Sequence, residues 1–132
     1  MLFLQVCKTQ NEEILLAGDF NEALGTNVSG MTKLCADLGL VDFMQSHHDG
    51  IDTTPTYVRG NTRIDYVLAT PHVAAACTAC GYEPFQHRFT GDHRGMFVEC
   101  NTGALLRSAT VGLSTPRNAN STLETVPATA GI

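Results

Sequence analysis

Aromatic residues are confined to one part of this chain, which limits where a hydrophobic core can form. All nine of them, six Phe and three Tyr, precede residue 102 in a sequence of 132 residues. Residues 103–132 contain eight Ser or Thr and only three charged residues. Such a segment buries too little apolar surface to offset the entropy lost on ordering. We therefore predict one folded domain over residues 1–102 and a disordered tail over residues 103–132.

Composition limits the class of protein. The hydrophobic fraction of 43% and the charged fraction of 16% exclude a collagen, a coiled coil or a disordered acidic chain. No apolar run approaches the roughly 18–20 residues that a membrane span needs, so we expect no membrane partner. Residues 1–8 lack a basic leader and a cleavage site, and the five cysteines are odd in number and irregular in spacing. We expect an intracellular protein, cytoplasmic or nuclear, that is not secreted.

Local hydrophobic patterns in the first part of the domain predict a strand and two helices. The continuous apolar run at 13–17 is typical of a strand buried on both faces. Apolar residues recur at helical spacing over 31–38, and Gly39 follows as the C′ glycine of that helix. Thr70-Pro71 offers an N-cap and an N1 proline for a short helix over 72–76.

Other segments are rich in β-forming residues. The runs at 56–59 and 63–68 flank a Gly-Asn loop, which predicts a hairpin. Residues 77–85 favour a strand, and 96–100 predict a final strand after a glycine-bracketed loop. The order is strand, helix, hairpin, strand, loop and strand. The fold class that we predict is therefore α/β (α+β).

Polar residues follow the first apolar strand directly. Asp19 and Asn21 are two positions apart, so in extended chain their side chains point the same way. The carboxylate can supply a base or a hard oxygen ligand, and the amide a neutral donor, at the rim of a sheet. The alternative is a turn, which Asp and Asn also favour.

Two further polar positions interrupt or precede strands. Asp65 faces away from Ile64 and Tyr66, so it either pairs with an arginine of the hairpin or orients a histidine. Asp92 and His93 lie between glycines just before the last strand. Adjacent side chains diverge, so Asp92 could bind a metal while His93 contacts substrate. A solvated polar loop is the alternative.

These clusters in this order, GDFN, then R-I-D-Y, then a D-H loop before a last strand, resemble the endonuclease/exonuclease/phosphatase superfamily. That superfamily includes pancreatic deoxyribonuclease, apurinic endonucleases and the endonuclease domains of non-LTR retroelements. The stretch 54–59 ahead of 63–66 is most similar to the retroelement branch. The resemblance covers about residues 13–100.

The resemblance implies a role for each site residue in a metal-dependent phosphodiester hydrolase. Asp19 would deprotonate the attacking water, and Asn21 would hold the scissile phosphate. Asp92 would ligate Mg²⁺ (or Mn²⁺), with Asp19 and Asn21 as further candidate ligands. His93 would contact the phosphate, and Asp65 would orient His93. The expected substrate partner is a nucleic acid, with DNA favoured, and a bridging cation would reconcile it with the net charge of −5.

The resemblance extends only to the C-terminal half of the family's domain. It implies half of a four-layer α/β sandwich: one mainly antiparallel sheet with one or two helices. The family's upstream strand with a metal-binding Glu has no counterpart here, so the implied endonuclease is truncated, and the missing N-terminal half is a candidate partner. We expect the isolated chain to be inactive or nearly so. The alternative is a catalytically inert fragment, or a binding module that keeps the half-fold without turnover.

One motif falls outside the resemblance. Cys77-Thr78-Ala79-Cys80 has the spacing of a metal or redox pair, but a second cysteine pair is lacking. His47 and His48 could supply two further zinc ligands. We favour instead a buried or partly buried cysteine pair in a strand, with the two histidines in a surface loop.

Overall fold

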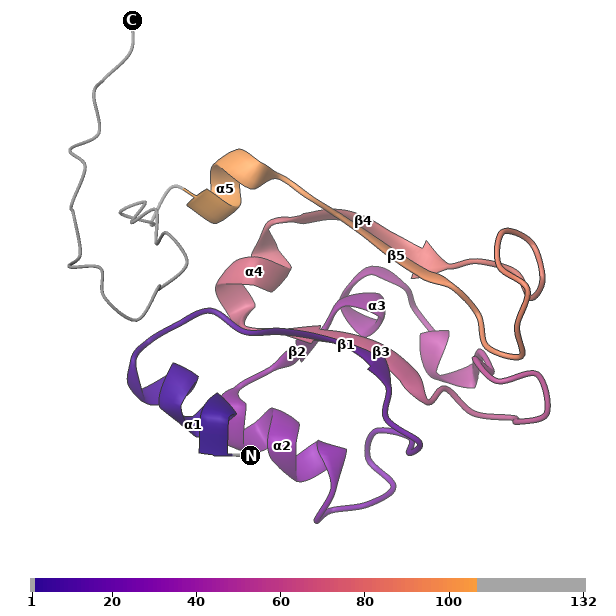
Figure 1. Cartoon of the computed structure of the whole chain (residues 1–132), viewed down its shortest axis with the longest axis horizontal. Coiled ribbons are helices and arrows are strands. Elements are labelled where there is room, and N and C mark those ends of the chain that lie inside the picture. Colours follow the sequence, from indigo (N-terminus) through magenta and orange to yellow (C-terminus); the bar gives the residue numbers. More distant parts are fainter. Residues whose placement is uncertain (1, 107–132) are drawn as a thin grey trace, which may run out of the picture.

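The structure, a computed structural model, describes residues 2–106 and shows a mixed α/β fold (Figure 1). This confirms the predicted class. Over these residues there are five α-helices, one 3₁₀ turn and five strands. In chain order they are α1 (Leu2–Thr9), β1 (Leu15–Asp19), α2 (Met31–Leu38), β2 (Val41–Asp42), α3 (Phe43–His47), the 3₁₀ turn (Ile51–Thr53), β3 (Asp65–Ala69), α4 (Pro71–Ala75), β4 (Cys77–Tyr82), β5 (Met96–Cys100) and α5 (Thr102–Leu106).

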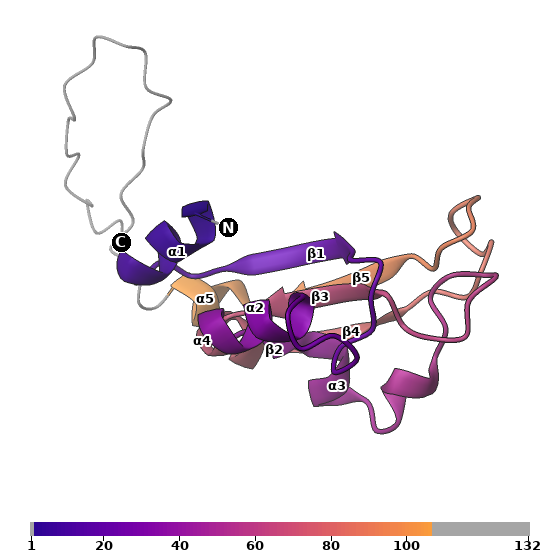
Figure 2. The same ribbon diagram turned by 90° about the horizontal axis from the view of Figure 1, so that it is seen from below.

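The strands form two antiparallel sheets rather than the single sheet that we predicted. The first has the order β1-β3-β2, which can be followed in Figure 2, and the second consists of β4 and β5. In the first sheet Leu15 lies opposite Ala69, and Asp19 lies opposite Asp65. The polar residues that end β1 and begin β3 therefore meet at one end of the sheet.

Strand β3 is buried along its whole length because both faces of the sheet are covered at this strand. On one face, Tyr66 and Leu68 pack with Met31 of α2. On the other face, Val67 and Ala69 join a core cluster with Phe43, Met44, Val73 and Cys80. Figure 1 shows the corresponding layers, with α1 and α2 on one side of the sheet and β4–β5 on the other. The predicted alternation of Tyr66 and Asp65 onto opposite faces follows from this arrangement.

Helix α2 has the predicted position and the predicted end. Gly39 adopts the left-handed conformation, with φ of 67°, and its N–H bonds to the Cys35 carbonyl. The first turn is capped from a distance, because the Glu22 carboxylate accepts a hydrogen bond from the Met31 N–H at 2.5 Å. Helix α4 has the predicted N1 proline, Pro71, and ends at Ala75, one residue before the predicted end.

Strand β1 is not buried on both faces, so that prediction is wrong. Burial alternates along β1, and Leu15 is 52% exposed. The reason is its place at the edge of the three-stranded sheet. Leu15 and Ala17 pair with Ala69 and Val67 and share their face, but the β4–β5 layer does not extend over β1.

The predicted hairpin of residues 56–59 with 63–68 is also wrong. Strand β3 pairs with β1 along its whole length and with β2 only at Leu68 and Ala69, and the 56–58 segment does not join this sheet. It runs beside the loop before β5, where the Val58 N–H donates to the Asp92 carbonyl and the Arg94 N–H to the Thr56 carbonyl, both at 2.8 Å. This pairing carries His93 towards the start of β3.

The predicted tail begins too early. Residues 103–106 belong to α5, and Leu105 packs against the core cluster that contains Val73. The rest of the predicted tail, residues 107–132, lies outside the described residues. No helix among residues 2–106 combines the length and the apolar character needed to cross a membrane.

Candidate acid–base site

A buried carboxylate at the start of β3 binds a histidine from the loop before β5. The Nδ1 atom of His93 lies 2.9 Å from Oδ2 of Asp65 and 3.2 Å from Oδ1. Asp65 is only 5% exposed. An ionised carboxylate can only accept, so Nδ1 carries the proton, and Nε2 is the ring atom left for other contacts. Of the two alternatives for Asp65, the structure shows the one in which it orients a histidine.

The backbone of Asp65 is held by two hydroxyl groups, one buried and one partly buried. Thr56 is fully buried, and its Oγ1 accepts hydrogen bonds from the N–H groups of Ile64 and Asp65 at 2.9 and 3.1 Å. The Tyr82 hydroxyl donates to the Asp65 carbonyl at 2.6 Å. Burial raises the pKa of Tyr82 to about 12, so this hydroxyl keeps its proton and remains a donor.

His93 is positioned by the segment that we had predicted to be part of a hairpin. Tyr57 and His93 form an isolated antiparallel bridge, and their rings lie 5.0 Å apart between centroids at a tilt of 33°. The neighbouring Arg94 side chain donates to the Pro55 carbonyl at 2.8 Å and lies over the Phe85 ring. Arg94 therefore ties the loop together instead of standing free in solvent.

Asp19 completes the group from the end of β1. Its Oδ2 lies 3.8 Å from His93 Nε2, and its side chain is partly exposed. Its Oδ1 accepts a hydrogen bond from the Asn21 N–H at 2.8 Å, and Asn21 has a φ of 55°. The residue that ends β1 thus forms an Asx-type turn and also faces the histidine. The turn predicted as the alternative for Asp19 is therefore present, and the same carboxylate faces His93.

The surrounding carboxylates favour the protonated form of His93. The hydrogen bond to Asp65 raises the pKa of His93, partial burial opposes that rise, and the charges of Asp65, Asp19 and Asp92 add to it. The imidazolium form, with a proton on each nitrogen, can donate to Asp65 and at the same time present a proton towards Asp19.

The structure brings together three of the five predicted site residues. The ligating atoms of Asp19, Asp65 and His93 all lie within 4.8 Å of one another, and Asp92 is not in this group. The Asp92 side chain is exposed, and its influence on His93 is the charge effect described above. Asn21 is next to the group, but among the described hydrogen bonds only its backbone N–H reaches Asp19.

The arginine that could have competed for Asp65 has other partners. Arg63 is buried, and its Nη2 lies 2.5 Å from Asp42 and 2.5 Å from Asp52. Its guanidinium also lies 4.4 Å from the centroid of the Tyr66 ring. Sequence reasoning missed this ion-pair cluster and the Thr56 hydroxyl. Thr56 gave no local signal, because a threonine in a β-rich run is expected in any strand.

These side chains do not complete a Mg²⁺ site by themselves. Mg²⁺ takes a near-octahedral shell of oxygen ligands. Both oxygens of Asp65 lie against His93 Nδ1, which leaves Asp19 as the available carboxylate of the three-residue group. Asp92 stands outside that group, because its neighbour His93 turns inward and adjacent side chains diverge. Mg²⁺ usually keeps several waters and takes one or two protein carboxylates, so an ion beside Asp19 would have waters or substrate oxygens in the rest of its shell.

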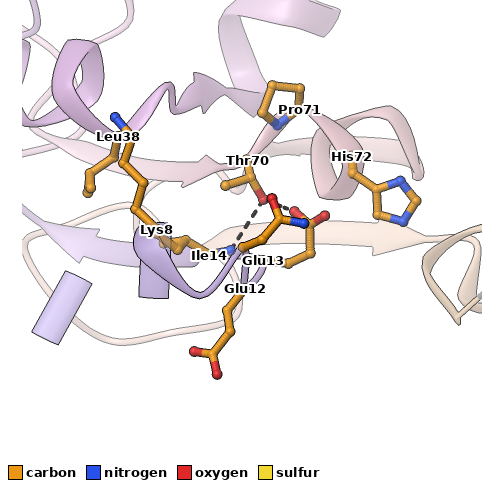
Figure 3. A pocket seen from close by; sticks show the side chains of 9 residues that line it. Lys8, Glu12, Glu13, Ile14, Leu38, Thr70, Pro71 and His72 are labelled. Atoms are coloured by element: carbon orange, nitrogen blue, oxygen red, sulfur yellow. Dashed lines mark hydrogen bonds between the residues drawn. The ribbon is translucent and has the colours of Figure 1, made fainter. Parts of the chain in front are cut away.

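A pocket of about 260 Å³ lies at the opposite end of β1 and β3 (Figure 3). Its lining includes Ile14, Thr70 and His72. The dashed lines in Figure 3 mark hydrogen bonds from the Ile14 N–H to Thr70 and from the Thr70 hydroxyl to Glu13. Thr70 is thus occupied by the segment before β1 and does not cap α4 with its side chain. The pocket is separate from the acid–base group.

Comparison with known proteins adds no family assignment. No protein-family model matches the sequence, and no match was found among curated proteins.

Proposed function

We propose that this chain carries the acid–base part of a metal-dependent phosphodiester hydrolase, of the kind found in retroelement DNA endonucleases. One observation supports this more than any other. His93 is held on one nitrogen by the buried Asp65, while its other nitrogen faces the partly exposed Asp19 at 3.8 Å. An imidazole oriented by a carboxylate and presented beside a second carboxylate is an arrangement suited to general acid–base chemistry.

The proposed roles follow from charge and position. The protonated His93 can donate from Nε2 to a phosphate oxygen and stabilise negative charge that develops there. The Asp19 carboxylate lies beside it and can accept a proton from an attacking water. Asn21, next to Asp19, offers a neutral amide to the phosphate, and Asp65 keeps the imidazole in one tautomer and orientation.

The metal site is the least complete part of the proposed catalytic group. The resemblance implies Mg²⁺ or Mn²⁺ held by Asp92, with Asp19 and Asn21 as further ligands. The described side chains do not supply a full oxygen shell at one point, so other groups would have to complete it. We therefore expect slow turnover at best from this chain alone, because catalysis by positioning falls steeply with misplacements of about 1 Å.

A supercoiled-plasmid nicking assay tests the proposal. The purified chain should nick slowly in Mg²⁺ or Mn²⁺ and not in chelator, and Asp19→Ala and His93→Ala should abolish nicking. His87→Ala is the matched control, because His87 is an exposed histidine of the same loop that pairs with Glu83 instead of Asp65. Nicking that is equal in all four proteins would show a contaminant and contradict the proposal.

The second candidate is a binding module without turnover, and the incomplete oxygen ligand set favours it. Fluorescence anisotropy with a labelled DNA duplex separates the two functions. DNA binding that survives His93→Ala, together with no metal-dependent nicking under any condition, would support the binding module over the hydrolase.

A further inference from the structure

A second cluster of ligating side chains lies between α3 and β4. His47 is the last residue of α3, and Cys77 and Cys80 are on β4. One ring nitrogen of His47 and the two sulfur atoms all lie within 4.8 Å of one another. The three residues belong to a different part of the fold from Asp19, Asp65 and His93, and none of them has a role in the proposed hydrolase.

A β-bulge accounts for the placement of the two cysteines. Cys77 pairs with Cys100, but the next pair is Ala79 with Glu99, so Thr78 is an extra residue in β4. In a regular strand, residues three positions apart point to opposite faces. The extra residue turns Cys77 and Cys80 to the same face of the sheet. Their cross-strand partners on β5 are Cys100 and Val98, which are two positions apart and therefore also share one face.

The histidine reaches this face because α3 is docked against β4. The Asp42 carboxylate caps α3 by accepting from the Met44 N–H at 3.0 Å. The Phe43 carbonyl then accepts from His47 Nδ1 at 3.0 Å and from Cys80 Sγ at 3.4 Å. One backbone oxygen therefore brings the imidazole and a thiol to the same point. The next residue, His48, donates from Nε2 to the Cys80 carbonyl at 2.7 Å and holds the end of the helix on the strand.

The donor set is soft, in contrast to the oxygen-rich group around His93. Two thiolates and an imidazole are ligands that Zn²⁺ takes in tetrahedral sites, with bond lengths of about 2.0–2.3 Å. Ligand atoms in such a tetrahedron are about 3.3–3.8 Å apart by that geometry. The cluster therefore needs only side-chain adjustment to enclose an ion. Cys80 is buried, Cys77 is partly buried and His47 is exposed, so an ion could reach the cluster from solvent on the His47 side.

We propose that His47, Cys77 and Cys80 bind one Zn²⁺ ion, with the fourth ligand position open to water. The ion would release the two thiol protons to solvent and link α3 to β4 through its coordination bonds, beside the core cluster that contains Phe43 and Cys80. Binding to the folded chain and not to the unfolded chain would raise the thermal midpoint as free zinc increases.

Metal analysis of the reduced, chelator-treated chain after addition of Zn²⁺ and gel filtration tests this proposal. We expect stoichiometric zinc in the unmodified chain and loss of zinc in His47→Gln and Cys77→Ser. These two positions are chosen because His47 is exposed and Cys77 is only half-buried, so both variants should fold. Circular dichroism checks that they do. Cys35→Ser and His87→Ala are the matched controls and should retain zinc.

The zinc experiment measures metal content and no activity. A result that contradicts the zinc site is therefore independent of whether the chain hydrolyses phosphodiesters. Absence of stoichiometric zinc in the unmodified chain would overturn it, and so would equal retention in His47→Gln and Cys77→Ser. If the chain is instead left in air after the reductant is removed, oxygen can accept the two electrons; an intact mass reduced by two hydrogens, with a Cys77–Cys80 disulfide that added Zn²⁺ does not prevent, would show a redox pair in place of a metal site.

Discussion

Asp19 and Asp65 lie directly opposite each other across strands β1 and β3, and His93 lies between their carboxylates. Like charges at opposite positions of an antiparallel pair destabilise a sheet. The imidazole relieves this repulsion, because Nδ1 bonds to Asp65 and Nε2 faces Asp19. When His93 is protonated, its positive charge therefore helps to hold this end of the sheet together.

The charge of His93 should make stability depend on pH. The pKa of His93 is raised in the folded chain, so the folded state binds this proton more strongly than the unfolded state. The stabilisation is fully present below the unfolded value of about 6.5 and is lost as pH rises through the folded value. The difference in thermal midpoint between the unmodified chain and His93→Gln should thus be larger at about pH 6 than at about pH 9. A difference that grows with pH would contradict this prediction.

The two carboxylates should contribute unequally to the raised pKa of His93. The hydrogen bond that His93 donates to Asp65 is the largest cause, whereas Asp19 acts only through its charge. We expect Asp65→Asn to lower the pKa of His93 more than Asp19→Asn does. Nuclear magnetic resonance titration of the imidazole protons measures both. The isosteric amides keep the volume of each side chain, and an equal effect of the two substitutions would show that Asp65 acts by charge alone.

Arg63 should be among the most sensitive positions for stability. Burial lowers its pKa, but the contacts with Asp42, Tyr82 and Asp52 outweigh that effect, so the pKa is raised and the charge persists. Arg63→Ala would leave the buried Asp42 carboxylate without its partner, at a cost of about 3–5 kcal/mol. Urea unfolding measures the free energy. Arg59→Ala is the control, because Arg59 is exposed, and it should change stability by no more than about 0.5 kcal/mol. Similar losses of unfolding free energy in the two variants would contradict the stabilising role that we assign to the Arg63–Asp42 ion pair.

Helix α5 provides a matched pair of leucines. Leu105 packs against the core cluster, whereas the neighbouring Leu106 is 58% exposed. Leu105→Ala should lower the thermal midpoint by several degrees, since about 1 kcal/mol shifts a domain of this size by about 4–8 °C. Leu106→Ala should leave it nearly unchanged. Equal midpoints for the two variants would mean that α5 does not contribute to the core.

Some of this structure follows from short stretches of sequence because the interactions that specify it are local. Helical spacing over 31–38 and the glycine at 39 predict α2 and its end, since both depend on contacts within a few residues. The Thr70-Pro71 pair predicts the start of α4 for the same reason. The alternation of Asp65 and Tyr66 onto opposite faces needs only the geometry of an extended chain.

Strand pairing and the identity of each residue's partner were decided by the tertiary structure. The 56–58 segment has the composition of a hairpin strand, but in the folded chain it lies beside the loop before β5, where Tyr57 pairs with His93. Cys77 and Cys80 have the spacing of a metal pair, but only the bulge at Thr78 turns them to one face, and only the docking of α3 brings His47 to them. Pairings between residues far apart in the chain depend on which edges and faces remain free once the core has formed, and no local pattern records that.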